Sequence, residues 1–101
     1  MKNIAIIGAG AAGLMTAATI LESTSGEDFH IYIFEKNTSP GKKVIISGGG
    51  RCNVTTTITD KKILETKYVR GWDAIRKSLG KFSPKKCYEW FELHGVPLKT
   101  E

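Results

Sequence analysis

The sequence predicts an α/β fold in which a strand–helix–strand unit is followed by further helices, and three observations carry this prediction. A predicted strand at residues 3–7, apolar over residues 4–7, leads directly into a Gly-x-Gly-x-x-Gly motif at residues 8–13. An uncharged stretch of helical type follows the motif. A second predicted strand at residues 30–35 is apolar over residues 31–34 and ends in the acid Glu35. This order of elements is typical of a βαβ unit with two parallel strands.

Each glycine of the motif has its own physical task. Gly8 lets the chain turn sharply off the first strand, where a positive φ suits glycine. Gly10 lacks a Cβ, so the backbone can approach a diphosphate, and Gly13 lets the helix pack closely on the strand. The helix N-terminus offers unpaired N–H groups and a partial positive charge, and Ala11 and Ala12 add little bulk there. The motif therefore predicts a dinucleotide-binding turn.

Glu35 strengthens the dinucleotide prediction. It follows Gly13 by 22 residues, close to the offset of about 20 that this motif shows. Its carboxylate can accept hydrogen bonds from the two hydroxyls of an adenosine ribose, and it disfavours the 2′-phosphate of NADP. Two plainer interpretations stay open: a tight turn without a ligand for the glycines, and a solvated strand end for Glu35.

The connections of the N-terminal half are predicted from turn residues. A helix over residues 11–22 should lead into a polar loop at residues 23–29. Pro40 and Gly41 mark a turn. The apolar residues 44–46 after this turn predict a short third strand.

Start and stop residues predict helices in the rest of the chain. Asp60 should cap a short helix at residues 60–66. The apolar spacing of residues 72–79 predicts a second helix, which Gly80 would end.

The clearest helix signal lies at residues 84–94. Ser83 is a good N-cap, Pro84 suits the first turn, and Gly95 suits the C-terminal cap. One face of this helix carries side chains that predict core packing rather than a role in cofactor binding: Cys87, Trp90, Phe91 and His94.

A second glycine-rich segment, residues 47–53, reads Ser-Gly-Gly-Gly-Arg-Cys-Asn. Three consecutive glycines lose much entropy on ordering, so a flexible spacer is the plain interpretation. A spacer rarely carries Arg, Cys and Asn directly after its glycines, which favours a structured loop. Cys52 could be a redox thiol, but without a partner thiol a packed side chain is favoured.

Composition argues against several function classes. The net charge is +5, yet the lysines are scattered and no aromatic–basic platform is visible, so we expect no nucleic-acid partner. The uncharged residues 4–21 carry three glycines in their middle, so we expect no signal peptide, no membrane segment and a cytoplasmic protein. Cys52 and Cys87 fit a reducing compartment, and they show no metal-ligand spacing with His30 or His94.

The length of 101 residues allows one domain at most. A doubly wound sheet buries both faces with about five or six strands, more than this sequence supplies. We therefore expect residues 1–101 to be the N-terminal part of a larger two-domain protein, with the substrate domain absent from the chain. Within it we expect a βαβ fingerprint at residues 3–35, a glycine loop at residues 47–53 and a helical region at residues 60–95.

Several segments together resemble one bacterial family, the BaiN-like FAD-dependent oxidoreductases, which include flavoproteins of the aminoacetone oxidase family. The Ser-Gly-Gly-Gly-Arg-Cys-Asn run is the most specific of these segments, whereas many flavoproteins share the first glycine motif. The family implies a Rossmann-like FAD-binding region, interrupted by a β-rich substrate domain. The segments that carry the resemblance are residues 8–13, 35–36, 40–43, 47–55 and 90–101.

The resemblance implies FAD rather than NAD at the N-terminal site. The first glycine motif would line the diphosphate, Glu35 would hold the adenosine ribose, and the second glycine loop would run close to the flavin. Arg51 or Asn53 would donate hydrogen bonds there; for Arg51, an ion pair that braces the loop is an equal alternative. The implied cofactor-binding residues are Gly8, Gly10, Ala11, Ala12, Gly13, Glu35, Lys36, Lys42, Lys43, Gly48, Gly49, Gly50, Arg51 and Asn53.

The functional hypothesis is an FAD-dependent oxidoreductase that transfers a hydride between a small organic substrate and flavin N5. NAD(P)H would be an electron donor of the full-length protein. No catalytic residue is assigned within the chain, and both amine oxidation and reduction of an activated double bond stay open. Two alternatives remain. The length favours a truncated, noncatalytic dinucleotide-binding fragment, while the second glycine loop argues against a simple NAD-binding module.

Overall fold

The structure, a computed structural model, describes residues 2–23 and 28–100. The chain divides into two compact units, Met1–Asn53 and Val54–Glu101. The loop predicted at residues 23–29 lies mostly outside the described residues. Among the residues that are described, no helix is long and apolar enough to cross a membrane.

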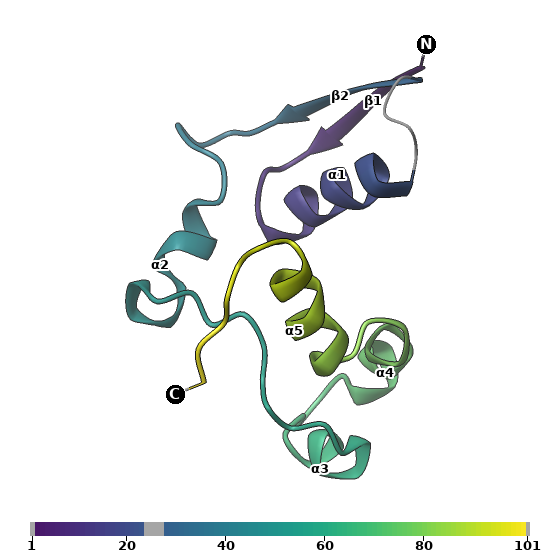
Figure 1. Cartoon of the computed structure of the whole chain (residues 1–101), viewed down its shortest axis with the longest axis vertical. Helices are drawn as coiled ribbons and strands as arrows, with labels where there is room; N and C mark the ends of the chain where they lie inside the picture. Colours follow the sequence, from purple (N-terminus) through teal and green to yellow (C-terminus); the bar gives the residue numbers. More distant parts are fainter. Residues whose placement is uncertain (1, 24–27, 101) are drawn as a thin grey trace. The chain divides into compact units, whose positions relative to one another are not determined.

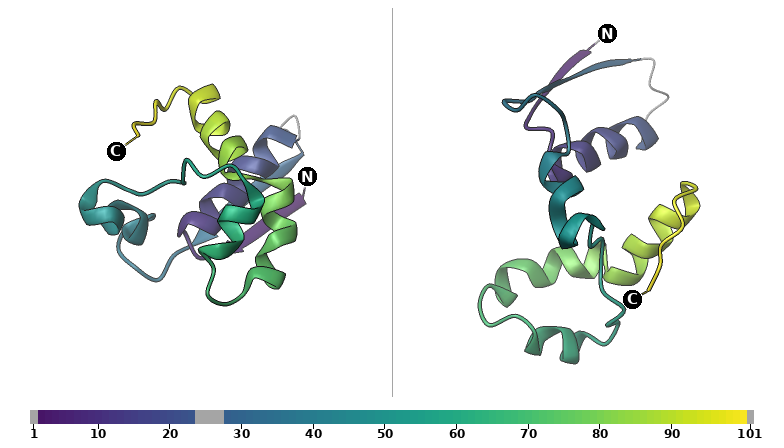
Figure 2. Two further views of the ribbon diagram at one scale, coloured as in Figure 1. Left: turned by 90° about the horizontal axis from the view of Figure 1, so that it is seen from below. Right: turned by 90° about the vertical axis from the view of Figure 1, so that its left-hand side faces the viewer.

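The first unit confirms the predicted βαβ arrangement. Its two described strands pair in parallel, with Ile4 opposite Ile31 and Ile6 opposite Ile33. The helix between them lies along one face of the strand pair (Figures 1 and 2). The elements of this unit are β1 (Lys2–Ile7), α1 (Ala11–Ser23), β2 (Phe29–Phe34) and α2 (Lys42–Gly50).

The two faces of the strand pair differ in burial. Ile6 points toward α1 and is buried, as is Ala17 on the helix. Side chains alternate between faces along a strand, so Ile7 and Phe34 point away from α1. Both are exposed, Ile7 to 82%. The core of this unit therefore lies between α1 and one face of the sheet.

The predicted third strand at residues 44–46 is wrong, because these residues belong to α2. The β-branched side chains favour a strand, but strand formation depends on a neighbouring strand that offers hydrogen bonds. Here Gly41 starts a helical turn instead: its carbonyl oxygen accepts a hydrogen bond from Ile45 N–H at 3.0 Å.

The second unit is helical. Asp60 caps α3 through its side chain, which accepts from Lys62 N–H at 2.8 Å, and Ser83 caps α5 in the same manner. Both caps were predicted. The helix predicted to end at Gly80 instead continues to Lys81, because one glycine near a helix end costs only about 1 kcal/mol. The helices are α3 (Lys61–Thr66), α4 (Trp72–Lys81) and α5 (Pro84–Leu93).

The apolar face of α5 is partly covered. Cys87, Trp90 and Phe91 are half-buried, whereas His94 is exposed. His94 stacks on the Trp90 ring, with ring centroids 4.1 Å apart, and its Nδ1 lies 2.6 Å from the Trp90 carbonyl oxygen. The packing predicted for this face holds for the first three residues and not for His94.

Candidate dinucleotide-binding site

The first glycine motif builds the turn between β1 and α1. Gly8 adopts a φ of +99°, and its N–H donates to the Phe34 carbonyl oxygen at 2.8 Å, so the turn lies where both strands end. α1 begins at Ala11, and its first intrahelical hydrogen bond runs from Leu14 N–H to the Gly10 carbonyl oxygen. The N–H groups before Leu14 have no partner within the helix and can serve an anion.

The glycines of this turn differ in what a side chain would meet. A Cβ at Gly10 would have no neighbour within 4 Å, and the same holds at Gly8. A Cβ at Gly13 would overlap the Gly8 carbonyl oxygen and lie 3.4 Å from a methyl carbon of Ile6. Gly13 is therefore required for packing inside the protein, whereas Gly10 leaves open space beside the turn.

Glu35 is tied to this turn by its carboxylate. Oε1 accepts from Ala9 N–H at 2.8 Å, and Oε2 accepts from Asn37 N–H at 2.7 Å. The hydrogen bonds from Ala9 and Asn37 both lower the pKa of Glu35, because each donor stabilises the charged form; the bond from Ala9 has the larger effect. A carboxylate has about four lone-pair sites, so each oxygen can accept a further hydrogen bond from a ligand hydroxyl.

A contact that sequence reasoning missed links α2 to the same turn. Gly41, with a φ of +65°, donates its N–H to the Ala9 carbonyl oxygen at 2.6 Å. Both residues are buried, and a Cβ at Gly41 would lie 3.6 Å from Leu14. The Pro40–Gly41 pair predicted a turn at this point, but it gave no indication that the turn contacts Ala9. The link places the start of α2, with the exposed Lys42 and Lys43, next to the glycine turn.

The second glycine segment leaves helical geometry at the end of α2. Ser47 has an extended ψ of 154°, and the three glycines after it have φ between 59° and 88°. Cys52 also has a positive φ of 56°, and its N–H donates to the Ser47 carbonyl oxygen at 2.9 Å. This segment is an ordered turn in which the glycines relieve backbone strain.

The position of the Asn53 side chain shows why glycine is required at residue 48. A Cβ at Gly48 would lie 2.7 Å from Cγ and Oδ1 of Asn53, so the amide packs directly against the glycine backbone. Gly49 and Gly50 have open space where a side chain would point, and Arg51 is exposed. Gly48 and Asn53 therefore support the loop, while Gly49 and Gly50 allow close approach from outside.

Hydrogen bonds thus bring some of the predicted cofactor-binding residues into one network. Hydrogen bonds join the first glycine turn, Glu35 and the start of α2, and Ala9 lies at the centre of all three. Lys36, Lys42 and Lys43 are exposed on the segments that leave this network. The second glycine loop is held by its own contacts and by those to α2.

A match over nearly the whole chain identifies the family. A family model described as the HI0933-like protein Rossmann domain matches residues 2–101. The chain belongs to this family. The match confirms the Rossmann-type α/β fold and the resemblance that the glycine segments carried, and the HI0933-like domain here contains the βαβ geometry described above.

Curated relatives of this HI0933-like domain are much longer. A 3-dehydro-bile acid delta(4,6)-reductase of Clostridium scindens is 40% identical over 102 residues, which cover 99% of this chain and 23% of the relative. Ribosomal RNA dihydrouridine synthase of Escherichia coli is 44% identical over 50 residues, half of this chain and 12% of the relative. The chain therefore spans about a quarter of the reductase. No solved structure matches.

The two cysteines lie outside this hydrogen-bond network. Burial raises the pKa of the Cys87 thiol, with a smaller opposing effect from a hydrogen bond to Thr55, so the unreactive protonated form dominates near neutral pH. Cys52 is half-buried in the strained loop, and both thiols are free. Within residues 2–23 and 28–100, no group of three or more His, Cys, Asp and Glu could hold a metal ion.

Proposed function

We propose that the Rossmann unit binds FAD and belongs to an oxidoreductase that transfers a hydride between a small organic substrate and flavin N5. The observation that carries the proposal is the turn between β1 and α1. It joins open space at Gly10 to a carboxylate, Glu35, held 2.8 Å from the Ala9 nitrogen. This arrangement fits an adenosine diphosphate moiety, because the two partners of diphosphate and ribose lie side by side.

In the proposed mode, the chain's residues bind and orient the cofactor. The N–H groups of Ala11, Ala12 and Gly13 hold the diphosphate, with Lys36, Lys42 and Lys43 offsetting its charge. Glu35 keeps its two backbone hydrogen bonds and accepts the ribose hydroxyls with its remaining lone pairs. FAD, when bound, supplies the site that accepts or releases the hydride.

The second glycine loop supports FAD over NAD. Gly49 and Gly50 present backbone without side chains to the outside, and Arg51 follows directly. Such a loop can approach a flat ring closely, and a donor beside the flavin would favour its anionic reduced form. An NAD half-site needs no second glycine loop. The family and the name of the reductase relative also support redox chemistry.

A glycine-to-alanine pair tests the site. Gly10→Ala adds a methyl group where a diphosphate would approach, and nothing in the protein opposes it. We expect FAD affinity to fall at least about tenfold in titrations of flavin fluorescence, since the loss of one charge-assisted hydrogen bond costs about 1.5–3 kcal/mol.

Gly80→Ala is the matched control. It makes the same chemical change on α4, at ordinary contact distance from Lys61, and should leave FAD affinity unchanged. Equal FAD affinity of Gly10→Ala and the parent protein would contradict the proposed position of the diphosphate.

A further inference from the structure

Positive charge is concentrated in one part of the chain. Residues 60–86 hold nine Lys and Arg against three Asp and Glu, whereas the rest of the chain holds six against seven. The whole positive net charge therefore comes from residues 60–86, which include α3, α4 and the start of α5. The proposed FAD site uses none of these residues. Ordinary solvated surfaces intersperse both signs, so this local excess favours contact with an anionic partner.

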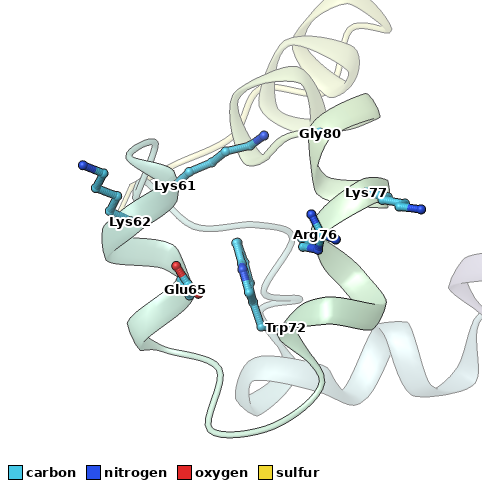
Figure 3. A pocket seen from close by; sticks show the side chains of 7 residues that line it. All are labelled: Lys61, Lys62, Glu65, Trp72, Arg76, Lys77 and Gly80. Atoms are coloured by element: carbon cyan, nitrogen blue, oxygen red, sulfur yellow. The ribbon is translucent and has the colours of Figure 1, made fainter.

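The same region contains a hollow of about 350 Å³ between α3 and α4 (Figure 3). Its volume lies in the range of small-molecule sites, roughly 300–1,000 Å³. Most of the side chains that line it are cationic and one is aromatic: Lys61, Lys62, Glu65, Trp72, Arg76, Lys77 and Gly80.

Trp72 gives the hollow a flat wall. Its half-buried indole stands between the two helices, with Arg76 on one side and Glu65 on the other (Figure 3). The Tyr68 ring lies next to the indole, with ring centroids 5.6 Å apart and the planes tilted by 47°. An indole with a guanidinium on one side and lysines around the same hollow can stack on a nucleobase while the cations hold its phosphate, and Glu65 is the one acid among the described residues of the lining.

The cations around Trp72 can change partners. Arg76 Nε lies 3.6 Å from Oδ1 of Asp73, and both side chains are largely exposed. Exposed pairs of this kind contribute about 0–1 kcal/mol, so a phosphate can compete for the guanidinium. Lys61 extends along the hollow toward Gly80, with its Nζ 3.8 Å from the Cβ position of that glycine.

We propose that this face of α3 and α4 binds single-stranded nucleic acid, with one base stacked on Trp72 and neighbouring phosphates on Lys61, Arg76 and Lys77. Further cations outside the hollow, such as Lys81, favour a polyanion over a single nucleotide. From the sequence we expected no nucleic-acid partner; that expectation did not take into account the excess of Lys and Arg over residues 60–86. The two helices bring them together around an aromatic ring.

Fluorescence anisotropy with a labelled 12-nucleotide single-stranded RNA tests the proposal on the full chain. Three phosphate contacts predict that affinity falls roughly 20-fold between 50 and 200 mM salt. Lys61→Glu combined with Lys77→Glu should weaken binding at least about tenfold more than Lys85→Glu combined with Lys99→Glu. The control pair makes the same charge change in the same unit but outside the hollow.

A second measurement separates stacking from charge and does not depend on truncating Trp72. Trp90→Phe leaves Trp72 as the single tryptophan, and its fluorescence should be quenched as RNA is added. Equal losses in the two charge pairs, or no quenching, would overturn the proposal. Uridine monophosphate binding as tightly as the oligomer would also overturn it, as would binding to anionic vesicles but not to RNA.

Discussion

Glu35 joins the end of β2 to the glycine turn, and each of its carboxylate oxygens serves a different backbone donor. Hydrogen bonds to an ionised acceptor are stronger than neutral ones, so this bracing depends on the charge of Glu35. The two donors lower its pKa below the ordinary value of 4.5. The stabilisation is therefore complete above about pH 4.5 and is lost as the pH falls through the lowered pKa.

Glu35→Gln should loosen the turn at neutral pH, because an amide presents N–H groups to one of the two donors. We expect the amide proton signals of Ala9 and Asn37 in NMR spectra to move upfield in the variant. In the parent protein the same signals should titrate with a midpoint below 4.5. Glu89→Gln, at an exposed position of α5, is the control. A midpoint at or above 4.5 would contradict the bracing role.

Substitutions at Gly48 and Gly49 distinguish the cost of a steric clash from the cost of backbone strain in the second glycine loop. Both have positive φ, but only at Gly48 would a Cβ meet the Asn53 side chain. Gly49→Ala should cost about 1–2 kcal/mol of unfolding free energy from strain alone. Gly48→Ala should cost more, and Asn53→Ala in the same chain should recover part of the excess, since the Asn53 backbone nitrogen still lies 3.0 Å from the added Cβ.

Chemical denaturation of the single and double variants measures this coupling. If Gly48→Ala and Gly49→Ala cost the same, and Asn53→Ala changes neither, the contact between Asn53 and Gly48 does not support the loop.

At the scale of elements, sequence patterns predicted what local chemistry decides. The helix caps at Asp60 and Ser83 agree with the structure because each depends on neighbouring residues. The βαβ unit also agrees, although its strands pair across 27 residues, because the spacing of the glycine motif is characteristic of that unit. The strand expected at residues 44–46 failed because the link between Gly41 and Ala9 is a tertiary contact. Helix α4 passes Gly80 because a single glycine near a helix end costs only about 1 kcal/mol, which does not suffice to end the helix.

The packing of α1 on β1 depends on Gly13. An alanine there would overlap the Gly8 carbonyl oxygen, which is backbone and cannot rotate away. We expect Gly13→Ala to destabilise the chain by about 1–3 kcal/mol or more in urea unfolding, as overpacking does. Gly10→Ala, three residues earlier with open space, should cost far less. Similar unfolding midpoints for the two variants would show that α1 does not pack closely on the turn.

For the molecule as a whole, the sequence predicted which segments meet at the glycine turn, but not the contacts that hold them together. Glu35 and the first glycine motif were predicted by spacing, and the structure joins them. The role of Asn53 as a support for Gly48, and the central place of Ala9, depend on loop conformation, which spacing does not encode. The hollow between α3 and α4 was not predicted from the sequence, because its lining residues come together only in the folded unit.

The identity of a cofactor carried through purification tests the account of the Rossmann unit. The longest reading frame that encodes the chain should be expressed, and its protein purified and denatured, with the released small molecule identified by mass and absorbance. We expect a yellow protein that releases FAD, and loss of the FAD in the Gly10→Ala variant. A colourless, folded protein that takes up NAD but not FAD would contradict the account.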